Sequence, residues 1–96
     1  MLELKVINLG ISGLNYFGNG SLFLTIGNPK RKKNPDFILV GRKKVVEVGD
    51  TKYWHTLDEI SKTVKDYETI GYQCLYLTDV DLNTDGWEER IKKFCE

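Results

Sequence analysis

Residues 34–55 of this chain read NPDFILVGRKKVVEVGDTKYWH. Two short runs of apolar and β-branched residues, 36–40 and 44–48, flank a Gly41-Arg42 pair that suits a tight turn. The pattern therefore predicts two antiparallel strands that are joined at this turn.

The register of this hairpin brings two acids together. If Gly41 and Arg42 are the two loop residues, counting back along both strands places Asp36 opposite Glu47. Opposed side chains of paired strands project from the same face, so the two carboxylates are expected to face each other. A four-residue loop would keep them on one face as diagonal neighbours, whereas a three-residue loop without a bulge would separate them.

Two opposed carboxylates repel each other and destabilise a plain hairpin, but they make sense with a cation between them. Mg²⁺ prefers hard oxygen ligands, usually one or two carboxylates with water and phosphate in the other positions. Asp36 and Glu47 supply such a half-site, and the backbone carbonyl near Val48 could complete it. Glu47 lies among valines, where an unpaired carboxylate is costly. Asp36 follows Pro35 and also fits a simple turn or cap residue.

His55, the one histidine of the chain, closes the same stretch. Hydrolysis of a phosphodiester at neutral pH needs a divalent cation, an activated water and help for the leaving oxygen. A histidine near the cation can act as the general base, because its ordinary pKa lies close to neutral pH. The alternative for a lone histidine before a helix is a structural role.

Positive charge is concentrated around the two acids. The formal net charge is zero, but residues 28–44 hold seven basic side chains and one acid, whereas residues 45–96 hold six basic and twelve acidic ones. Such a local excess attracts the phosphate backbone of a nucleic acid, although a solvated loop and turn would look the same. The predicted DNA-binding residues are Lys30, Arg31, Lys32, Lys33, Arg42, Lys43 and Lys44.

The rest of the chain predicts a mixed sheet with helices. Before residue 34 we expect a helical turn or a strand over residues 1–9, a hairpin turn at Asn19-Gly20, a strand over 21–26 and a basic loop over 27–34. After residue 55 we expect a helix over 56–70, a strand over 72–78 and a helix over 85–94. A Thr56–Glu59 capping box and Gly71 would cap the first of these helices, and Asp85 would cap the second. A β-meander followed by helix, strand and helix requires a crossover connection. The fold class is therefore α/β (α+β), with a mixed central sheet flanked by helices.

Length and composition limit the classes of protein to which this chain can belong. Ninety-six residues suit one domain. There is no apolar run long enough for a membrane span and no secretory signal at the start. Cys74 and Cys95 lie far apart without CxxC spacing, which favours buried thiols in a reducing, cytoplasmic compartment over a disulfide or a zinc site.

Three segments carry a family resemblance: Pro35-Asp36-Phe37, Val45-Val46-Glu47-Val48 and Tyr53-Trp54-His55. Together they resemble the very-short-patch repair (Vsr-type) endonucleases and the related catalytic domains of phage-encoded homing endonucleases, a branch of the PD-(D/E)XK superfamily. The resemblance covers roughly residues 15–90 and rests on short motifs. It implies a restriction-endonuclease-like core that cleaves double-stranded DNA with Mg²⁺, for which Mn²⁺ may substitute, in a bacterial or phage-infected cell.

The resemblance also implies roles for individual residues. Asp36 would be the principal Mg²⁺ ligand, His55 the catalytic histidine, and Glu47 or Val48 the second metal position. Asp50 would stand where the repair enzymes have a second histidine, and Glu3 would match the N-terminal glutamate of the family.

The chain departs from the family patterns at two points. Gly49 replaces the superfamily lysine, which favours histidine chemistry, and the single histidine and misplaced cysteines argue against the structural zinc site and mismatch specificity of the repair enzymes. A chain of this length fits an isolated catalytic domain, which would act as a homodimer or with a DNA-recognition domain outside this chain.

Two other classes compete with a nuclease. One is a non-catalytic DNA-binding module that uses residues 30–33 and 42–44, and the other is a protein-interaction domain whose carboxylates bind basic partners. Neither gives a reason for Asp36 and Glu47 to share a face. The nuclease interpretation explains the most residues at once and is therefore preferred.

Overall fold

A mixed four-stranded sheet lies at the centre of the computed structural model, which describes residues 2–51 and 57–96. Its strands lie in the order β1 (Leu14–Tyr16), β4 (Phe37–Leu39), β5 (Lys44–Gly49) and β6 (Gln73–Thr78). The β1–β4 and β4–β5 pairs are antiparallel, whereas β5 and β6 pair in parallel. The predicted α/β (α+β) fold with a mixed sheet is confirmed.

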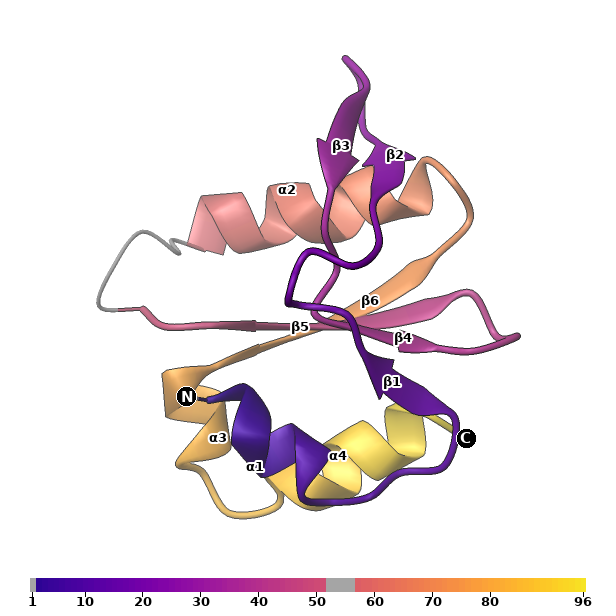
Figure 1. Cartoon of the computed structure of the whole chain (residues 1–96). Helices are drawn as coiled ribbons and strands as arrows, with labels where there is room; N and C mark the ends of the chain where they lie inside the picture. The colour runs from indigo at the N-terminus through magenta and orange to yellow at the C-terminus, as the bar shows by residue number, and fades with distance from the viewer. Residues whose placement is uncertain (1, 52–56) are drawn as a thin grey trace.

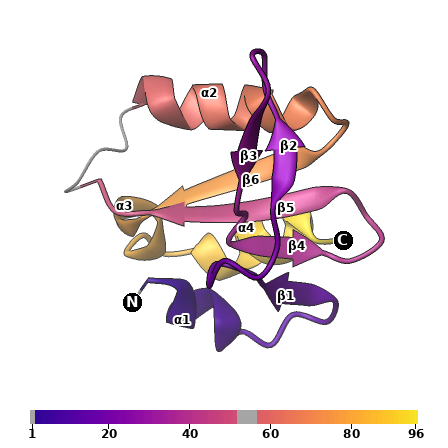
Figure 2. The same ribbon diagram turned by 45° about the horizontal axis from the view of Figure 1, so that its top comes forward.

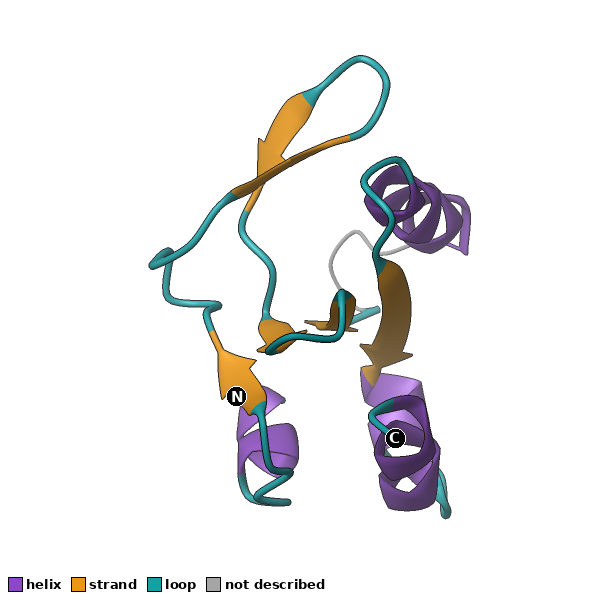
Figure 3. Cartoon of the chain, turned by 90° about the vertical axis from the view of Figure 1, so that its right-hand side faces the viewer, coloured by secondary structure: helices purple, strands orange, loops and turns teal. Residues whose placement is uncertain are grey.

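Helices cover both faces of this sheet. One face carries α2 (Leu57–Glu68) and a separate hairpin of β2 (Leu24–Ile26) and β3 (Arg31–Lys33), as Figures 1 and 3 show. The helices of the opposite face are α1 (Glu3–Ile7), α3 (Asp79–Leu82) and α4 (Trp87–Phe94). No helix in the described part of the chain is long and apolar enough to cross a membrane.

The alternation of side chains along β4 and β5 divides the core into two clusters. Phe37 and Val46 pack on the side of α1 and α4, whereas Ile38 and Val45 pack on the side of α2. Because β5 has a paired strand on each edge and a layer on each face, residues 45–49 are all buried. A charged side chain in this strand is consequently removed from water.

The β4–β5 hairpin has the predicted register. Phe37 pairs with Val46 and Leu39 pairs with Lys44, which is the pairing that a Gly41-Arg42 loop requires. Regular pairing stops at these residues, and Gly41 lies in the turn with a φ of +82°, a conformation that favours glycine. Residue 36 is therefore level with residue 47.

Helix α2 and strand β6 also follow the prediction. Helix α2 joins β5 to the parallel strand β6, and Gly71 follows the helix with a φ of +78°. Trp87, Ile91 and Phe94 of α4 all belong to the cluster on the far face of the sheet. Figure 2 shows β5 and β6 side by side beneath α2. Cys74 and Cys95 are free thiols, as expected, but they are only partly buried.

Predictions about pairing in the N-terminal half were wrong. Asn19-Gly20 does form a turn, with the Gly20 N–H donating to the Phe17 carbonyl, but no hairpin forms there, because β1 pairs with β4 and β2 pairs with β3. The predicted loop 27–34 contains β3. A local turn signal does not determine which distant strand supplies the hydrogen-bonding partner.

Several helix details also differ from the prediction. The N-cap of α4 is Gly86, with a φ of +91°, and not Asp85. Helix α3 was not expected, and Leu57, which the periodicity placed on the apolar face of α2, is 82% exposed. Thr56, the predicted cap of α2, lies outside the described residues.

Candidate functional site

The carboxyl groups of Asp36 and Glu47 meet on the face of the sheet that carries α2. The Asp36 N–H donates to Oε2 of Glu47 at 3.3 Å, and the two side chains lie within hydrogen-bonding reach of each other. The geometric prediction that these two acids share a face is confirmed.

Glu47 is buried and receives contacts from two other elements. Its side chain is only 3% exposed. The Tyr67 hydroxyl, on α2, donates to Oε1 of Glu47 at 2.6 Å, and Nζ of Lys33, on β3, lies 3.5 Å from the same oxygen. Burial and the neighbouring Glu47 carboxylate raise the pKa of Tyr67, so its hydroxyl remains a donor. The contacts from α2 and β3 thus go to one oxygen of Glu47, and the Asp36 N–H contacts the other.

Asp36 is half-buried beside this acid. Burial, followed by the charge of Glu47, raises the pKa of Asp36 from 3.8 to about 7, although the Val48 N–H and Lys33 oppose the shift. The Val48 N–H donates to Oδ2 of Asp36 at 2.8 Å. Within the described part of the chain, Lys33 is the one cation in ion-pair contact with the two acids. When both acids are ionised, the pair would therefore carry more negative charge than Lys33 neutralises.

The Val48 carbonyl can supply a third oxygen. In a strand, the N–H and the C=O of one residue point towards the same neighbour, and the Val48 N–H points to Asp36. Continuing the β4–β5 register two residues beyond the Phe37–Val46 pair would place Pro35 opposite Val48. Since proline has no N–H, it cannot donate a ladder hydrogen bond to this carbonyl.

This donor set fits Mg²⁺. Two carboxylates and a carbonyl are hard oxygen ligands, and the remaining positions of a Mg²⁺ ion are commonly water or phosphate. Among residues 2–51 and 57–96, no cluster of three or more His, Cys, Asp and Glu side chains could hold a metal. The described residues therefore offer two carboxylates and a carbonyl, fewer ligands than the all-protein sites that Ca²⁺ or Zn²⁺ commonly occupies.

Glu3 and Asp50, two other predicted catalytic residues, are not part of the acid pair. Glu3, on α1, lies near Tyr16, whose pKa is raised by burial, then by Glu3 and then by Asp36. Glu3 is therefore a neighbour of the site and not a member of the pair. Asp50 is half-buried directly after β5. His55 lies outside the described residues, so its role stays a prediction.

The predicted DNA-binding residues divide into two groups. The first is on the β2–β3 hairpin, where Lys30 and Lys32 are exposed and Lys33 reaches Glu47. Arg31 forms an ion pair with Asp66 of α2 at 2.8 Å. Figures 1 and 3 show this hairpin projecting from the sheet beside α2.

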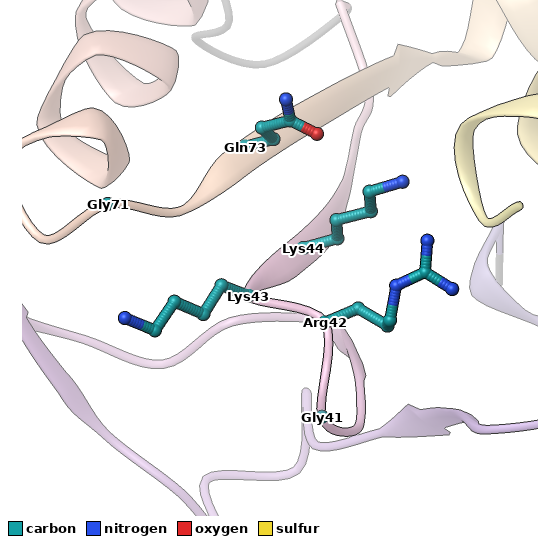
Figure 4. A pocket seen from close by; sticks show the side chains of 6 residues that line it. All are labelled: Gly41, Arg42, Lys43, Lys44, Gly71 and Gln73. Atoms are coloured by element: carbon teal, nitrogen blue, oxygen red, sulfur yellow. The ribbon is translucent and has the colours of Figure 1, made fainter.

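The second group lies at the β4–β5 turn, three or more residues from Glu47 along the strand and so on the order of 10 Å away. Lys44 donates to the Phe94 carbonyl at 2.8 Å and Arg42 donates to the Glu96 carbonyl, so both contact the end of α4. Figure 4 shows Lys43 pointing away from Arg42 and Lys44. These three side chains do not converge on one ligand.

Sequence reasoning missed two contacts of Glu47. Tyr67 was expected only on the apolar face of its helix, and Lys33 only as a surface cation. A buried tyrosine hydroxyl and a buried glutamate each need a partner, which is the signal that could have matched them.

Comparisons with known protein families, with curated proteins and with solved structures found no match to this chain.

Proposed function

We propose that this chain is a Mg²⁺-dependent DNA endonuclease domain of the homing-endonuclease type. The observation that supports this most is the Asp36–Glu47 pair, in which two carboxyl groups meet in a mostly buried place with one lysine beside them. Removing two like charges from water destabilises a fold unless a cation offsets them. A divalent cation and a phosphate group would complete such a site.

Each residue of the proposed site would have its own role in the reaction. Asp36, Glu47 and the Val48 carbonyl would hold the ion, and Lys33 would contact the scissile phosphate. Mg²⁺, when bound, lowers the pKa of a coordinated water and neutralises charge on the phosphate. The resemblance assigns removal of a proton from water to His55. Glu3 and Asp50 belong to the proposal only through that resemblance.

The β2–β3 hairpin is the proposed DNA contact. A two-stranded ribbon fits the major groove of B-DNA, and this ribbon carries the exposed side chains of Lys30 and Lys32. Because Lys33 of this hairpin lies 3.5 Å from Glu47, DNA bound to the hairpin would be close to the acid pair. Binding through these lysines should weaken steeply with salt.

Plasmid cleavage tests the catalytic proposal. Supercoiled DNA at low salt should be nicked or linearised with Mg²⁺ or Mn²⁺ and remain intact with EDTA. Asp36→Ala should abolish cleavage while its circular dichroism stays that of the wild type, and Asp85→Ala, at an exposed loop acid, should cleave normally. Intact plasmid with both metals would contradict the proposal.

A pair of charge reversals tests the DNA contact. Lys32→Glu on the hairpin and Lys93→Glu on α4 change the net charge equally, but the two residues lie on opposite sides of the sheet. Lys32→Glu should weaken binding to a duplex about tenfold or more, and Lys93→Glu should have much less effect. Equal losses would indicate that only the total charge matters and would remove the hairpin from the proposal.

A further inference from the structure

The two oxygens of Glu47 have different contacts. Within residues 2–51 and 57–96, the contacts from outside the β4–β5 hairpin go to Oε1, from the Tyr67 hydroxyl at 2.6 Å and the Lys33 ammonium at 3.5 Å. Oε2 faces Asp36 and accepts its N–H at 3.3 Å, near the long limit of a hydrogen bond. The carboxylate is thus oriented so that one oxygen is directed at the second acid.

The two partners of Oε1 differ in charge and in burial. Tyr67 is fully buried, and its hydroxyl is a neutral donor in a fixed position on α2. Lys33 is 31% exposed and carries its charge on a long, flexible side chain. A cation that binds between Asp36 and Glu47 is repelled by the ammonium and unaffected by the charge of the hydroxyl.

We infer that Tyr67 and Lys33 set the affinity of the acid pair for a divalent cation in opposite directions. The Tyr67 hydroxyl is a positioning group, which holds the Glu47 carboxylate in the orientation that binds the ion. The Lys33 ammonium competes with the ion for the same negative charge. This inference rests on the metal site of the proposed function and adds to it the two residues that tune the site.

The mechanism follows from general properties of metal ligands. A carboxylate that is already oriented loses less freedom when the ion arrives. A hydrogen bond from a neighbouring residue to a metal ligand therefore commonly strengthens metal binding by about 10- to 100-fold. A nearby positive charge has the opposite effect, because it repels the ion and already neutralises part of the ligand charge. Tyr67 supplies the first effect at Glu47 and Lys33 supplies the second.

The test is calorimetric titration of the whole chain with Mn²⁺ alone, in the absence of DNA. Tyr67→Phe keeps the ring and removes only the hydroxyl, and it should weaken Mn²⁺ binding about tenfold. Lys33→Met keeps the length of the side chain and removes its charge, and it should tighten binding severalfold. Asp36→Asn should bind weakly or not at all. Circular dichroism checks that each variant is folded.

The outcomes separate this inference from the proposed function. If the wild type and Asp36→Asn both fail to bind Mn²⁺, the metal site itself is refuted, and with it the proposed function. If the wild type binds and folded Tyr67→Phe binds equally well, Tyr67 is only structural and the inference is overturned. Weaker binding by Lys33→Met also overturns it. This second variant decides the matter even if Tyr67→Phe does not fold, since Lys33 is partly exposed.

Discussion

Two acidic sites lie on the α2 side of the sheet, and they differ in how many cations neutralise their carboxylates. Asp66, on α2, is 7% exposed and receives Arg31 at 2.8 Å and Lys62 at 3.3 Å. The Arg31 hydrogen bond, which outweighs the effect of burial, lowers the pKa of Asp66. At the other site, Asp36 and Glu47 share contact with Lys33 alone among the described cations.

The difference distinguishes a structural acid from a candidate binding site. Two cations on one carboxylate leave nothing for a ligand to neutralise, so Asp66 is explained as a link between α2 and β3. Two ionised carboxylates beside one cation leave a deficit of positive charge. Arg31 and Lys33 are alternate residues of β3, and they connect the same strand to both sites. The β2–β3 hairpin therefore contacts one acid that two cations neutralise, Asp66, and one acid pair that has a single cation beside it.

Catalytic activity should separate the two sites most strongly. Glu47→Gln keeps an acceptor for the Tyr67 hydroxyl but removes a charge that the proposed function assigns to metal binding, so Mg²⁺-dependent plasmid cleavage should fall by about 1000-fold, or ~4 kcal/mol of barrier. Asp66→Asn should cleave within about tenfold of wild type at a temperature where it is folded. Comparable losses in both variants would remove the distinction between the sites.

The pH dependence of stability should also differ in sign. The pKa of Asp36 is raised from 3.8 to about 7 on folding, so the folded state binds more protons than the unfolded state between these values. The free energy of unfolding should therefore fall as pH rises from about 4 to 7, by up to ~1.4 kcal/mol per pH unit. The lowered pKa of Asp66 gives the opposite sign, since its stabilisation is lost as pH falls below 3.8.

Urea denaturation in EDTA from pH 3 to pH 8 measures these slopes. Asp36→Asn should flatten the decline between pH 4 and 7, and Asp66→Asn should leave that decline in place while reducing the loss below pH 4. A wild-type protein whose free energy of unfolding rises steadily from pH 4 to 7 would contradict the raised pKa of Asp36.

The acid pair could be predicted from the sequence because it depends on local geometry. The period of two along a strand and the short Gly41 turn determine that Asp36 and Glu47 share a face, without knowledge of the rest of the fold. Glu47 was also recognisable as buried, because its valine neighbours indicate a central strand. The glycine after α2 was predictable in the same way, from a conformation that glycine adopts readily.

The partners of the pair could not be predicted, because they depend on tertiary placement. Lys33 reaches Glu47 only because residues 31–33 form a strand of a separate hairpin, whereas the basic composition of this segment indicated a loop. Asn19-Gly20 showed the converse error, since a strong turn signal was read as a hairpin although its flanking strands belong to different sheets. Pairing between distant segments is decided by packing, which short-range patterns do not contain.

Removing the charge of Asp66 should destabilise the fold, in contrast to the same change at Asp36. Asp66→Asn takes away the hydrogen-bonded ion pair with Arg31, and we expect a loss of about 2 kcal/mol in the free energy of unfolding at pH 7. The value stays modest because Arg31 and Lys62 are partly exposed and can be hydrated. Asp36→Asn at pH 8 should leave stability unchanged or raise it. Urea denaturation of both variants compares them directly, and equal destabilisation would show that the two acids are alike.

Mg²⁺ should stabilise the protein through one site and not the other. A ligand at about five times its dissociation constant stabilises the folded state by ~1 kcal/mol, which is a shift of a few degrees in Tm for a domain of this size. Wild type and Asp66→Asn should show this shift at pH 8, where competition from protons is weakest, and Asp36→Asn should not. An equal shift in Asp36→Asn would mean that the ion binds elsewhere. Lys33→Met should show a larger shift than the wild type at the same Mg²⁺ concentration, because the deficit of positive charge at Asp36 and Glu47 is then greatest.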